Sequence, residues 1–263
     1  MVQRRKLAWR GIADHFIDGE FQSADDGAGN CVDGDCGARY YEGADEAPCR
    51  YRRGRMIIAV DGPTASGKGT LAKALAAHFG LPFLDTGLLY RAVGRQVQLH
   101  QGNADNPADA LAGCGFPDIL LDDPILRSEE IGGLASRVSI HPVVRTALNK
   151  RQVDFANQPG GALLDGRDIG TVIAPQADVK LFITAPADIR ARRRHAEMHR
   201  HGMDVTFTDI FADIQARDAR DMARADAPLK PAEDALLLDT GDLTIGDAVQ
   251  AAIALVESRL CKS

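Results

Sequence analysis

A glycine-rich run between an apolar segment and a helix-forming segment constrains this 263-residue chain more than any other feature. The run reads Gly62, Pro63, Thr64, Ala65, Ser66, Gly67, Lys68, Gly69, Thr70. Its glycines allow backbone angles that side chains forbid, so that successive N–H groups can converge on a phosphate. The apolar residues 56–60 predict a strand before the run, and the pattern after it predicts a helix whose positive end attracts anions. This order of strand, loop and helix predicts a phosphate-binding loop.

Two side chains bring chemistry to the loop. Lys68 can reach the β- and γ-phosphates of a nucleoside triphosphate, and the hydroxyl of Thr70 can serve Mg²⁺. The strict motif has Ser or Thr directly after the lysine, whereas Gly69 intervenes here. This variant is the form that nucleoside monophosphate kinases use, and it therefore favours a kinase of that kind over other proteins with a phosphate-binding loop.

Composition and charge narrow the class of protein further. No apolar run is long enough to span a membrane, and the net charge of −6 argues against a nucleic-acid partner. The five cysteines are odd in number and lack the spacing of a disulfide framework, which favours reduced thiols in a cytosolic protein. We therefore expect a monomeric cytoplasmic enzyme that binds anions through local clusters of arginine.

The chain divides near Met56. Residues 1–55 are rich in Gly, Asp, Ala and Arg without sustained periodicity, and we expect them to form a disordered N-terminal extension. Because Met56 directly precedes the first predicted strand, the natural protein could begin there, with the residues before it included by a wrong start. The alternative is a partner-binding arm. In both cases residues 56–263 form the phosphate-binding domain.

Predicted strands and helices alternate from Met56 onward, which indicates an α/β fold with a five-stranded parallel sheet covered by helices on both faces. Further strands are expected at 81–84, 162–164, 179–184 and 235–238. Helices are expected at 71–79, 88–99, 129–155 with a break at His141 and Pro142, from 187, from 208, and at 245–260. Residues 102–128 contain many Gly, Asn, Pro and Asp and are expected to form an irregular insert.

Two polar segments follow predicted strands, where a parallel sheet places function. The first contains Asp85, Thr86 and Arg91, although helix caps and a solvated arginine are the simpler explanation of these residues alone. The second begins with Asp165, which is placed to act near Mg²⁺ directly or through water, and continues with Arg167, which is placed near a phosphate. A charged surface turn is the alternative.

A third segment, the helix expected from residue 208, carries charges where its apolar pattern predicts core. The stripe of Ile210 and Ile214 continues at helical spacing into Arg217, Asp221 and Arg224. Buried charges are costly unless they are paired or bound to a ligand, so the helix either leaves the core there or faces a bound anion. Four arginines at 190–194 precede a glycine-containing loop and suggest a lid over phosphates.

Taken together, these motifs resemble those of the bacterial cytidylate kinases, a branch of the nucleoside monophosphate kinases. The shared segments are 61–63, 66–70, 85–91, 165–168 with Gly170 and Thr171, and the Arg217, Asp221, Arg224 set. The resemblance covers nearly everything from Met56 onward. It implies a P-loop kinase with an acceptor-binding insert at about 102–160 and a lid at about 190–208. Two departures are Thr86, where the family often has Ser, and a shortened segment 102–128, which leaves open whether the family's small antiparallel sheet forms.

The resemblance also implies which residues bind the substrates, ATP and CMP or dCMP. The glycine-rich run 62–70 would hold ATP, with lid contacts from Arg190 and Arg194. The acceptor would be bound by Thr86, Arg91, Ser136, Arg145, Arg167, Asp168, Arg217, Asp221 and Arg224. In this set Ser136, Arg145 and Asp168 would read the cytosine edge, Asp221 would hold the ribose, and the other arginines would hold the 5′-phosphate. Catalysis would fall to Lys68, Asp165, Arg167 and Arg217, with Mg²⁺ held by Thr70 and Asp165 through water.

The implied reaction fits the residues that the chain offers. An acceptor 5′-phosphate is anionic at pH 7 and needs no general base, so that catalysis consists mainly of alignment and charge neutralisation. The chain has a phosphate-binding loop and several arginines, and it shows no Ser-His-Asp triad and no cluster of metal-binding histidines. Two alternatives stay open: a P-loop kinase for another small acceptor such as UMP, AMP or shikimate, and a non-catalytic ATP-binding switch or adaptor.

Overall fold

The computed structural model describes residues 55–200 and 202–261, so the predicted extension lies outside the described residues except for Arg55. Five parallel strands form one sheet in the order β2-β3-β1-β4-β5, which confirms the predicted fold class. Their bounds are β1 (Met56–Asp61), β2 (Phe83–Asp85), β3 (Gly161–Gly166), β4 (Val179–Thr184) and β5 (Leu236–Asp239). All five lie within two residues of the predicted positions. Between residues 55 and 261, no described helix is both long enough and apolar enough to cross a membrane.

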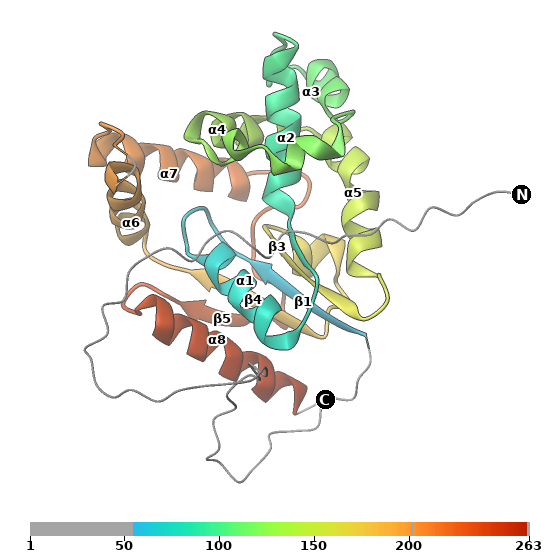
Figure 1. Ribbon diagram of the computed structural model, residues 1–263, viewed down its shortest axis with the longest axis vertical. Helices are drawn as coiled ribbons and strands as arrows, with labels where there is room; N and C mark the ends of the chain where they lie inside the picture. Colours follow the sequence, from blue (N-terminus) through green and yellow to red (C-terminus); the bar gives the residue numbers. More distant parts are fainter. Residues whose placement is uncertain (1–54, 201, 262–263) are drawn as a thin grey trace, which may run out of the picture. The chain divides into compact units, whose positions relative to one another are not determined.

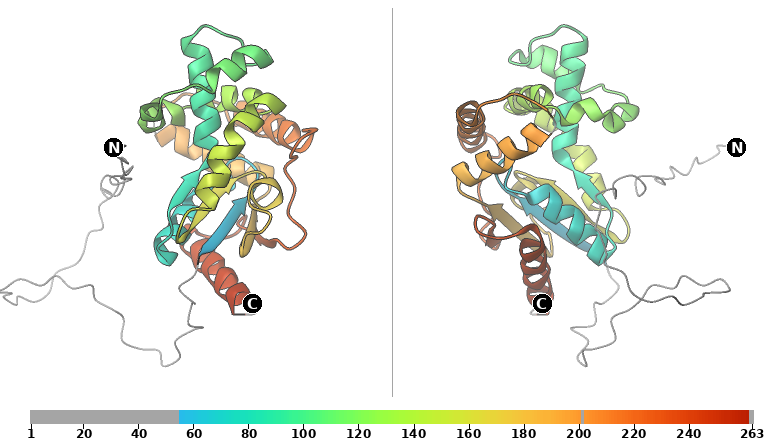
Figure 2. Two further views of the ribbon diagram at one scale, coloured as in Figure 1. Left: turned by 90° about the vertical axis from the view of Figure 1, so that its right-hand side faces the viewer. Right: turned by 60° about the vertical axis from the view of Figure 1, so that its left-hand side comes forward.

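The sheet is covered on both faces, as Figures 1 and 2 show. Alternate residues of β1 point to opposite faces, which is the two-residue period of a strand. Met56, Ile58 and Val60 pack on one face against α1 (Lys68–Phe79) and α8 (Ile245–Leu260). Ile57 and Ala59 pack on the other face against a single π-helical turn, η3 (Ile169–Ile173), and against the end of α5 (Pro142–Ala156).

A second apolar core lies in the helices above the carboxyl edge of the sheet (Figure 1). It is formed by α2 (Thr86–Leu99), α3 (Pro107–Gly113), α4 (Glu129–Val138) and α5, with two short 3₁₀ turns, η1 (Asp118–Asp122) and η2 (Pro124–Arg127). The predicted break at His141 and Pro142 is confirmed, because Pro142 is the first residue of α5.

The prediction that residues 102–128 are irregular is wrong. They contain α3, η1 and η2 and no strand, so the family's small antiparallel sheet does not form in this segment. The side chain of Asn106 caps α3 by accepting hydrogen bonds from the backbone N–H groups of Ala108 and Asp109. Asn106 and Pro107 are therefore a helix start, with proline at the first helical position, rather than the loop that their residue types suggest in isolation.

Two further helices, α6 (Ala187–Arg200) and α7 (Phe207–Met222), form a hairpin beside the P-loop. A small core joins them and includes Ala191, Met198, Ile210 and Ile214. Arg217 and Asp221 are buried on α7, so the helix does not leave the core at these charges, which was one of the two alternatives. Arg224 does not continue the apolar stripe, because the helix ends at Met222.

Candidate active site

The backbone of the glycine-rich run forms a tight turn between β1 and α1. A Cβ on Gly62 would lie 2.1 Å from the carbonyl oxygen of Ile183, so no other residue fits there without a shift of the backbone. Gly67 caps α1 with a φ of 82°, and Ala65 has a φ of 56°, which L side chains rarely adopt. Residues 64–71 line a cavity of about 940 Å³ that also meets α4, α6, α7 and the start of α8. The run thus has the open backbone cradle that the motif predicts.

Lys68 and Asp165 face each other at the floor of this cavity. The lysine Nζ lies 3.9 Å from Oδ1 of Asp165 and donates to the carbonyl oxygen of Pro63 at 3.5 Å. Burial and the neighbouring Arg167 lower the pKa of Lys68 to about 8, and burial raises the pKa of Asp165 to about 6. Both shifts show charged groups held out of water with only loose mutual pairing, as in a site prepared for a further charged ligand.

The same floor fits a magnesium ion bound with the nucleotide. Oδ1 of Asp165 is buried and has no hydrogen-bond partner, and Thr70 lines the same cavity. Among the described residues no group of three or more His, Cys, Asp or Glu could hold a metal alone. Mg²⁺ commonly keeps several waters and takes only one or two protein oxygens beside substrate phosphates, so this sparse donor set suits it.

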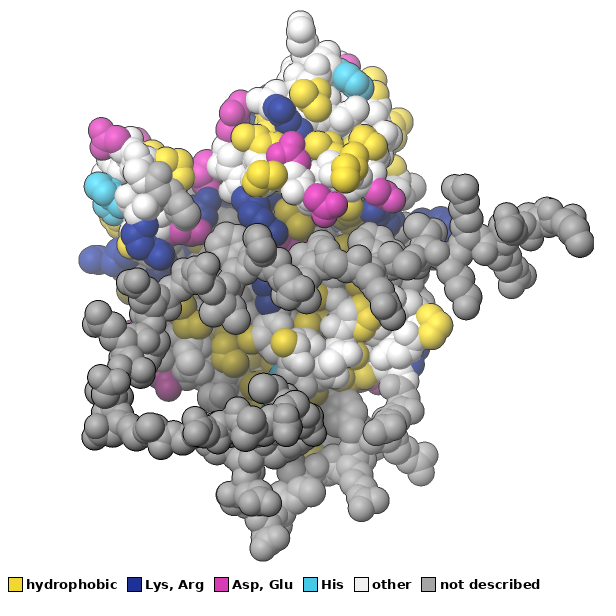
Figure 3. Space-filling view, viewed as in Figure 1, with side chains coloured by type: hydrophobic (Ala, Val, Ile, Leu, Met, Phe, Trp, Pro, Cys, Tyr) yellow, Lys and Arg dark blue, Asp and Glu magenta, His cyan; other side chains and the backbone are white. Residues whose placement is uncertain are grey.

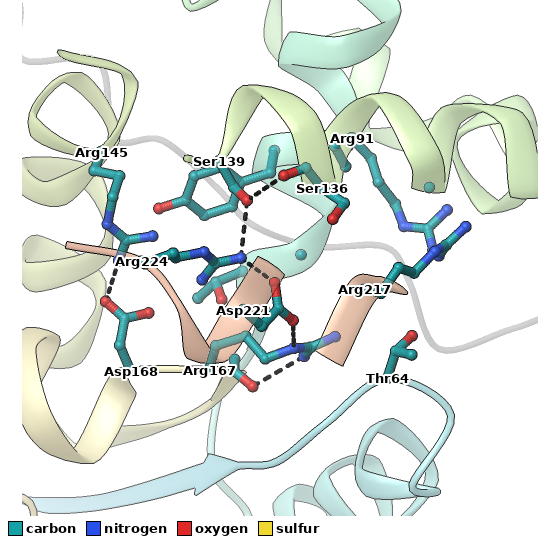
Figure 4. Close-up of a pocket in the computed structure, with 16 residues that line it drawn as sticks. Thr64, Arg91, Ser136, Ser139, Arg145, Arg167, Asp168, Arg217, Asp221 and Arg224 are labelled. Atoms are coloured by element: carbon teal, nitrogen blue, oxygen red, sulfur yellow. Dashed lines mark hydrogen bonds and ion pairs between the residues drawn. The ribbon is translucent and has the colours of Figure 1, made fainter. Parts of the chain in front are cut away.

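A second cavity lies beyond the carboxyl ends of β1 and β3 and is drawn in Figure 4. All nine residues predicted for the acceptor line it: Thr86, Arg91, Ser136, Arg145, Arg167, Asp168, Arg217, Asp221 and Arg224. They come from α2, α4, α5, α7, the segment after β3 and the residues directly after α7. Segments up to 138 residues apart in the sequence are therefore brought together around one space.

Arg145 and Asp168 form a buried ion pair on one wall of this second cavity (Figure 4). Their side chains are 10% and 6% exposed, and the Arg145 guanidinium lies over the ring of Tyr90, 5.8 Å from its centroid. Burial raises the pKa of Asp168, and Arg145 and Arg224 oppose that rise. The pair presents a donor and an acceptor side by side, which is the arrangement needed to read the edge of a base.

Asp221 joins two arginines at the floor of the cavity (Figure 4). Its Oδ2 accepts from Nε of Arg167 at 3.0 Å, and its Oδ1 accepts from Arg224. Arg224 also donates to the hydroxyl of Ser139 at 2.9 Å. Nearby, the hydroxyl of Ser136 accepts from Nε of Arg220 at 3.1 Å.

Arg91 and Arg217 lie side by side across Gly132 of α4 (Figure 4). A Cβ at Gly132 would lie 3.0 Å from a guanidinium nitrogen of Arg91 and 3.1 Å from one of Arg217. Burial, with Arg217 as the next cause, lowers the pKa of Arg91 to about 10. Two adjacent guanidinium groups at a cavity wall repel each other unless an anion lies between them, so this position suits a phosphate. The space-filling view in Figure 3 shows basic side chains gathered between the upper helices and the sheet.

Arg190 is a correction to the predicted ATP contacts. Its side chain is buried, and its guanidinium donates to the carbonyl oxygens of Ala185 and Thr64 at 2.8 and 3.1 Å and to both oxygens of Asp218 at 3.2 and 2.6 Å. Arg190 therefore braces the phosphate-binding loop from behind and does not line the large cavity. Arg194 does line it, where it forms ion pairs with Glu129 and Glu197.

The alternative explanations of the segment 85–91 are not supported. Asp85 stands at the cap position of α2 but makes no capping hydrogen bond, and its side chain borders the large cavity. The Thr86 hydroxyl donates to the carbonyl oxygen of Asp165 at 2.8 Å. Arg91 is not solvated either, because it donates to the carbonyl oxygens of Leu126 and Ser128 at 2.7 and 2.9 Å.

Three residues that line the two cavities were not predicted as site residues from the sequence: Tyr90, Glu129 and Ser139. Ser139 lies three residues after Ser136 and therefore at the same helix end, which is a signal that could have identified it. Glu129 pairs with both Arg194 and Arg217, and its local sequence does not predict these ion pairs.

The fold and the two connected cavities define a P-loop phosphotransferase with an arginine-rich acceptor pocket. The family model for cytidylate kinase matches residues 58–113 and 120–258, and the chain belongs to that family. The chain is similar to many curated proteins, among them three cytidylate kinases. Identity is 55% over 205 residues with that of Xanthobacter autotrophicus, 52% over 204 with that of Methylocella silvestris, and 52% over 203 with that of Caulobacter vibrioides. These alignments cover 77–78% of this chain and 98%, 94% and 95% of the respective relatives.

Proposed function

We propose that this protein transfers the γ-phosphoryl group of ATP to CMP and dCMP, forming CDP and dCDP. The observation that carries the proposal is the wall shared by the two cavities. Thr64, Gly87, Arg91, Arg167 and Arg217 line both the cavity of the phosphate-binding loop and the acceptor cavity. A group that moves from donor to acceptor would therefore pass three arginines, which can neutralise the charge of the transferred phosphoryl group.

ATP, the phosphoryl donor, would be held by the loop amides of residues 62–70 and by Lys68. Thr70 and Asp165, through water, are the residues that would hold Mg²⁺, which when bound supplies charge neutralisation to the donor phosphates. Lys68 Nζ lies 3.9 Å from Oδ1 of Asp165, and both residues line the floor of this cavity. Arg194 reaches this cavity from α6 and is the supported lid contact of the two that the sequence suggested.

The acceptor side has groups that match the edge of cytosine. The amino group of cytosine needs an acceptor, and its ring nitrogen and carbonyl need donors. Asp168 offers the acceptor, and Arg145 and Ser136 offer donors. Uracil would set a carbonyl against the Asp168 carboxylate and an N–H against Arg145, so it should bind worse. Asp221 would hold the ribose, and Arg91, Arg167, Arg217 and Arg224 the 5′-phosphate.

The chemical step then needs no general base from the protein. An oxygen of the acceptor phosphate forms a bond to the γ-phosphorus while the bond to the β,γ-bridging oxygen breaks, and ADP leaves. Lys68, Arg167 and Arg217 would neutralise charge along this path, and Asp165 would orient the lysine. We expect the enzyme to work as a monomer in the cytoplasm with these small substrates and without nucleic acid or membrane.

A coupled assay with ATP and a panel of acceptors tests the proposal. CMP and dCMP should be phosphorylated well, and UMP, AMP and shikimate poorly. Arg145→Ala should shrink the preference for CMP over UMP, because an unpaired buried group typically costs about 1–3 kcal/mol. Arg151→Ala is the matched control, since Arg151 lies on the same helix but pairs with Asp118 at the surface. A preference for another acceptor, or ATP binding without transfer, would show that the proposal is wrong.

A further inference from the structure

Asp61 is a buried carboxylate that the reaction described above does not use. It is the last residue of β1, directly before the phosphate-binding loop, and it is 5% exposed. Its Oδ1 accepts from the backbone N–H of Ile169 at 2.8 Å, and its Oδ2 accepts from that of Gly170 at 2.7 Å. These two amides open the π-helical turn η3, where the first N–H groups have no partner within the turn. Asp61 thus caps η3 from a neighbouring strand.

The residue next to the capped amides is Asp168. Its carbonyl oxygen accepts from the N–H groups of Val172 and Ile173 at 2.8 and 3.2 Å, so η3 closes on Asp168 from the other side. Its side chain pairs with Arg145 in the acceptor cavity. The position of the Asp168 carboxylate therefore depends on the position of η3, and the two hydrogen bonds to Asp61 hold that turn.

The backbone at Asp61 is also held in place. Gly62 follows it directly, and there a Cβ would collide with the backbone of Ile183 on β4. Asp61 itself lies in register with Gly166 of β3 and Phe182 of β4. Its carboxylate is therefore fixed to the start of the phosphate-binding loop.

A carboxylate is a costly choice of cap at this position. Burial raises the pKa of Asp61 to about 7, although both backbone hydrogen bonds oppose the rise. An apolar residue at the end of a buried strand would avoid that cost, but it would leave two amides of η3 unpaired.

We propose that Asp61 is a positioning residue for acceptor selection, which fixes Asp168 relative to the phosphate-binding loop. The proposal rests on the proposed function, because it takes Asp168 as the group that faces the amino group of cytosine. Phosphoryl transfer depends on alignment, and a displacement of the base-reading carboxylate by a fraction of an ångström weakens the correct acceptor more than an incorrect one.

Asp61→Asn tests the idea with little change of shape. The amide keeps one acceptor oxygen but turns its NH₂ toward the other backbone N–H, so that one half of the clamp opens. We expect KM for CMP to rise roughly tenfold or more, and the ratio of kcat/KM for CMP over UMP to fall by a similar factor. KM for ATP should stay within about twofold, because the loop amides are untouched.

Two further variants separate the possible outcomes. Ile169→Val removes one methyl from a buried side chain of the same turn and keeps both N–H groups, so it should lower the melting temperature without changing the CMP over UMP ratio. Asp168→Asn should collapse the ratio by itself.

If Asp168→Asn does so and Asp61→Asn does not, the role of Asp61 is refuted and the proposed function stands. If Asp168→Asn leaves the ratio intact, base reading in the proposed function fails as well. If Ile169→Val lowers the CMP over UMP ratio as much as Asp61→Asn does, the effect comes from general instability, and the positioning role of Asp61 is refuted.

A measurement on the unchanged protein covers the case in which Asp61→Asn does not fold. Amide hydrogen exchange by NMR should show Ile169 and Gly170 protected to the level of the β1 amides. Rapid exchange at both positions would mean that the clamp is open in solution, and the proposal would be wrong.

Discussion

Gly132→Ala should lower the activity of the protein while the fold tolerates the change. Gly132 lies inside α4, where alanine is favoured over glycine by about 0.5–1 kcal/mol. The added Cβ, however, would lie 3.0 and 3.1 Å from two guanidinium nitrogens of Arg91 and 3.1 Å from one of Arg217. Both side-chain ends can move away by several tenths of an ångström, so the fold should tolerate the change. The two arginines that are proposed to bind the acceptor phosphate would nevertheless be displaced.

The expected loss follows from what those arginines are proposed to bind. Hydrogen bonds to charged groups contribute about 1.5–3 kcal/mol each, and partial loss at two arginines should cost about as much as one full bond. We expect kcat/KM for CMP at saturating ATP to fall roughly ten- to hundredfold, with the loss shared by all acceptors because a phosphate contact carries no information about the base.

Gly133→Ala is the matched control for this prediction. Gly133 is the next residue of the same helix, and a Cβ there would meet no atom within 4 Å. It borders the donor cavity, so it is compared at saturating ATP. It should gain the helix stabilisation, about 2–4 °C in melting temperature per kcal/mol for a domain of this size, and keep kcat/KM for CMP. Equal kcat/KM in the two variants would refute the placement of Arg91 and Arg217 at the acceptor phosphate.

Three further predictions concern Lys68, the pH dependence of activity and the boundary of the domain. Lys68→Ala should lower kcat roughly a hundredfold or more with little change in KM for CMP, measured in the coupled assay, because the lysine acts on charge that grows during transfer. The pKa of Lys68 is lowered to about 8, so kcat/KM for ATP should fall as the pH rises above 8 and the lysine loses its proton, whereas kcat at saturating ATP should fall only at higher pH because bound phosphates favour the charged form. A protein of residues 56–263 should match the full chain in melting temperature and CMP turnover, and a truncated protein that aggregates or loses activity would place the boundary elsewhere.

The sequence predicts the sheet and the phosphate-binding loop well for a physical reason. The inner strands of a parallel sheet are largely buried on both faces and have mainly apolar sequences, as in residues 162–164 and 179–184. The loop depends on local backbone freedom, which its glycines display directly. The buried charges of α7 are also visible, because Arg217 and Asp221 interrupt an apolar stripe. Such features are local, and local patterns suffice to find them.

What the sequence does not reveal are the partners of charged groups. Arg190 and Arg194 lie one helical turn apart in an arginine-rich stretch, yet Arg190 pairs with Asp218 and donates to Thr64 of the loop, whereas Arg194 borders the cavity. That difference depends on a carboxylate 28 residues away on another helix. Asp61 is similar, because its partners are backbone amides 108 and 109 residues further on. A pattern along one element carries no information on such contacts.

Three of the arginines that are proposed to bind phosphate already pair with carboxylates of the protein. Arg167 and Arg224 pair with Asp221, and Arg217 pairs with Glu129. For these arginines, an incoming phosphate exchanges one anionic partner for another, and the net gain in free energy is small. Arg91 differs, since the structure gives it two carbonyl acceptors and, in the described part of the chain, no carboxylate. Its lowered pKa shows the cost of that arrangement. The acceptor phosphate should therefore gain most of its binding free energy at Arg91, and the other arginines should act chiefly through their placement along the path of transfer.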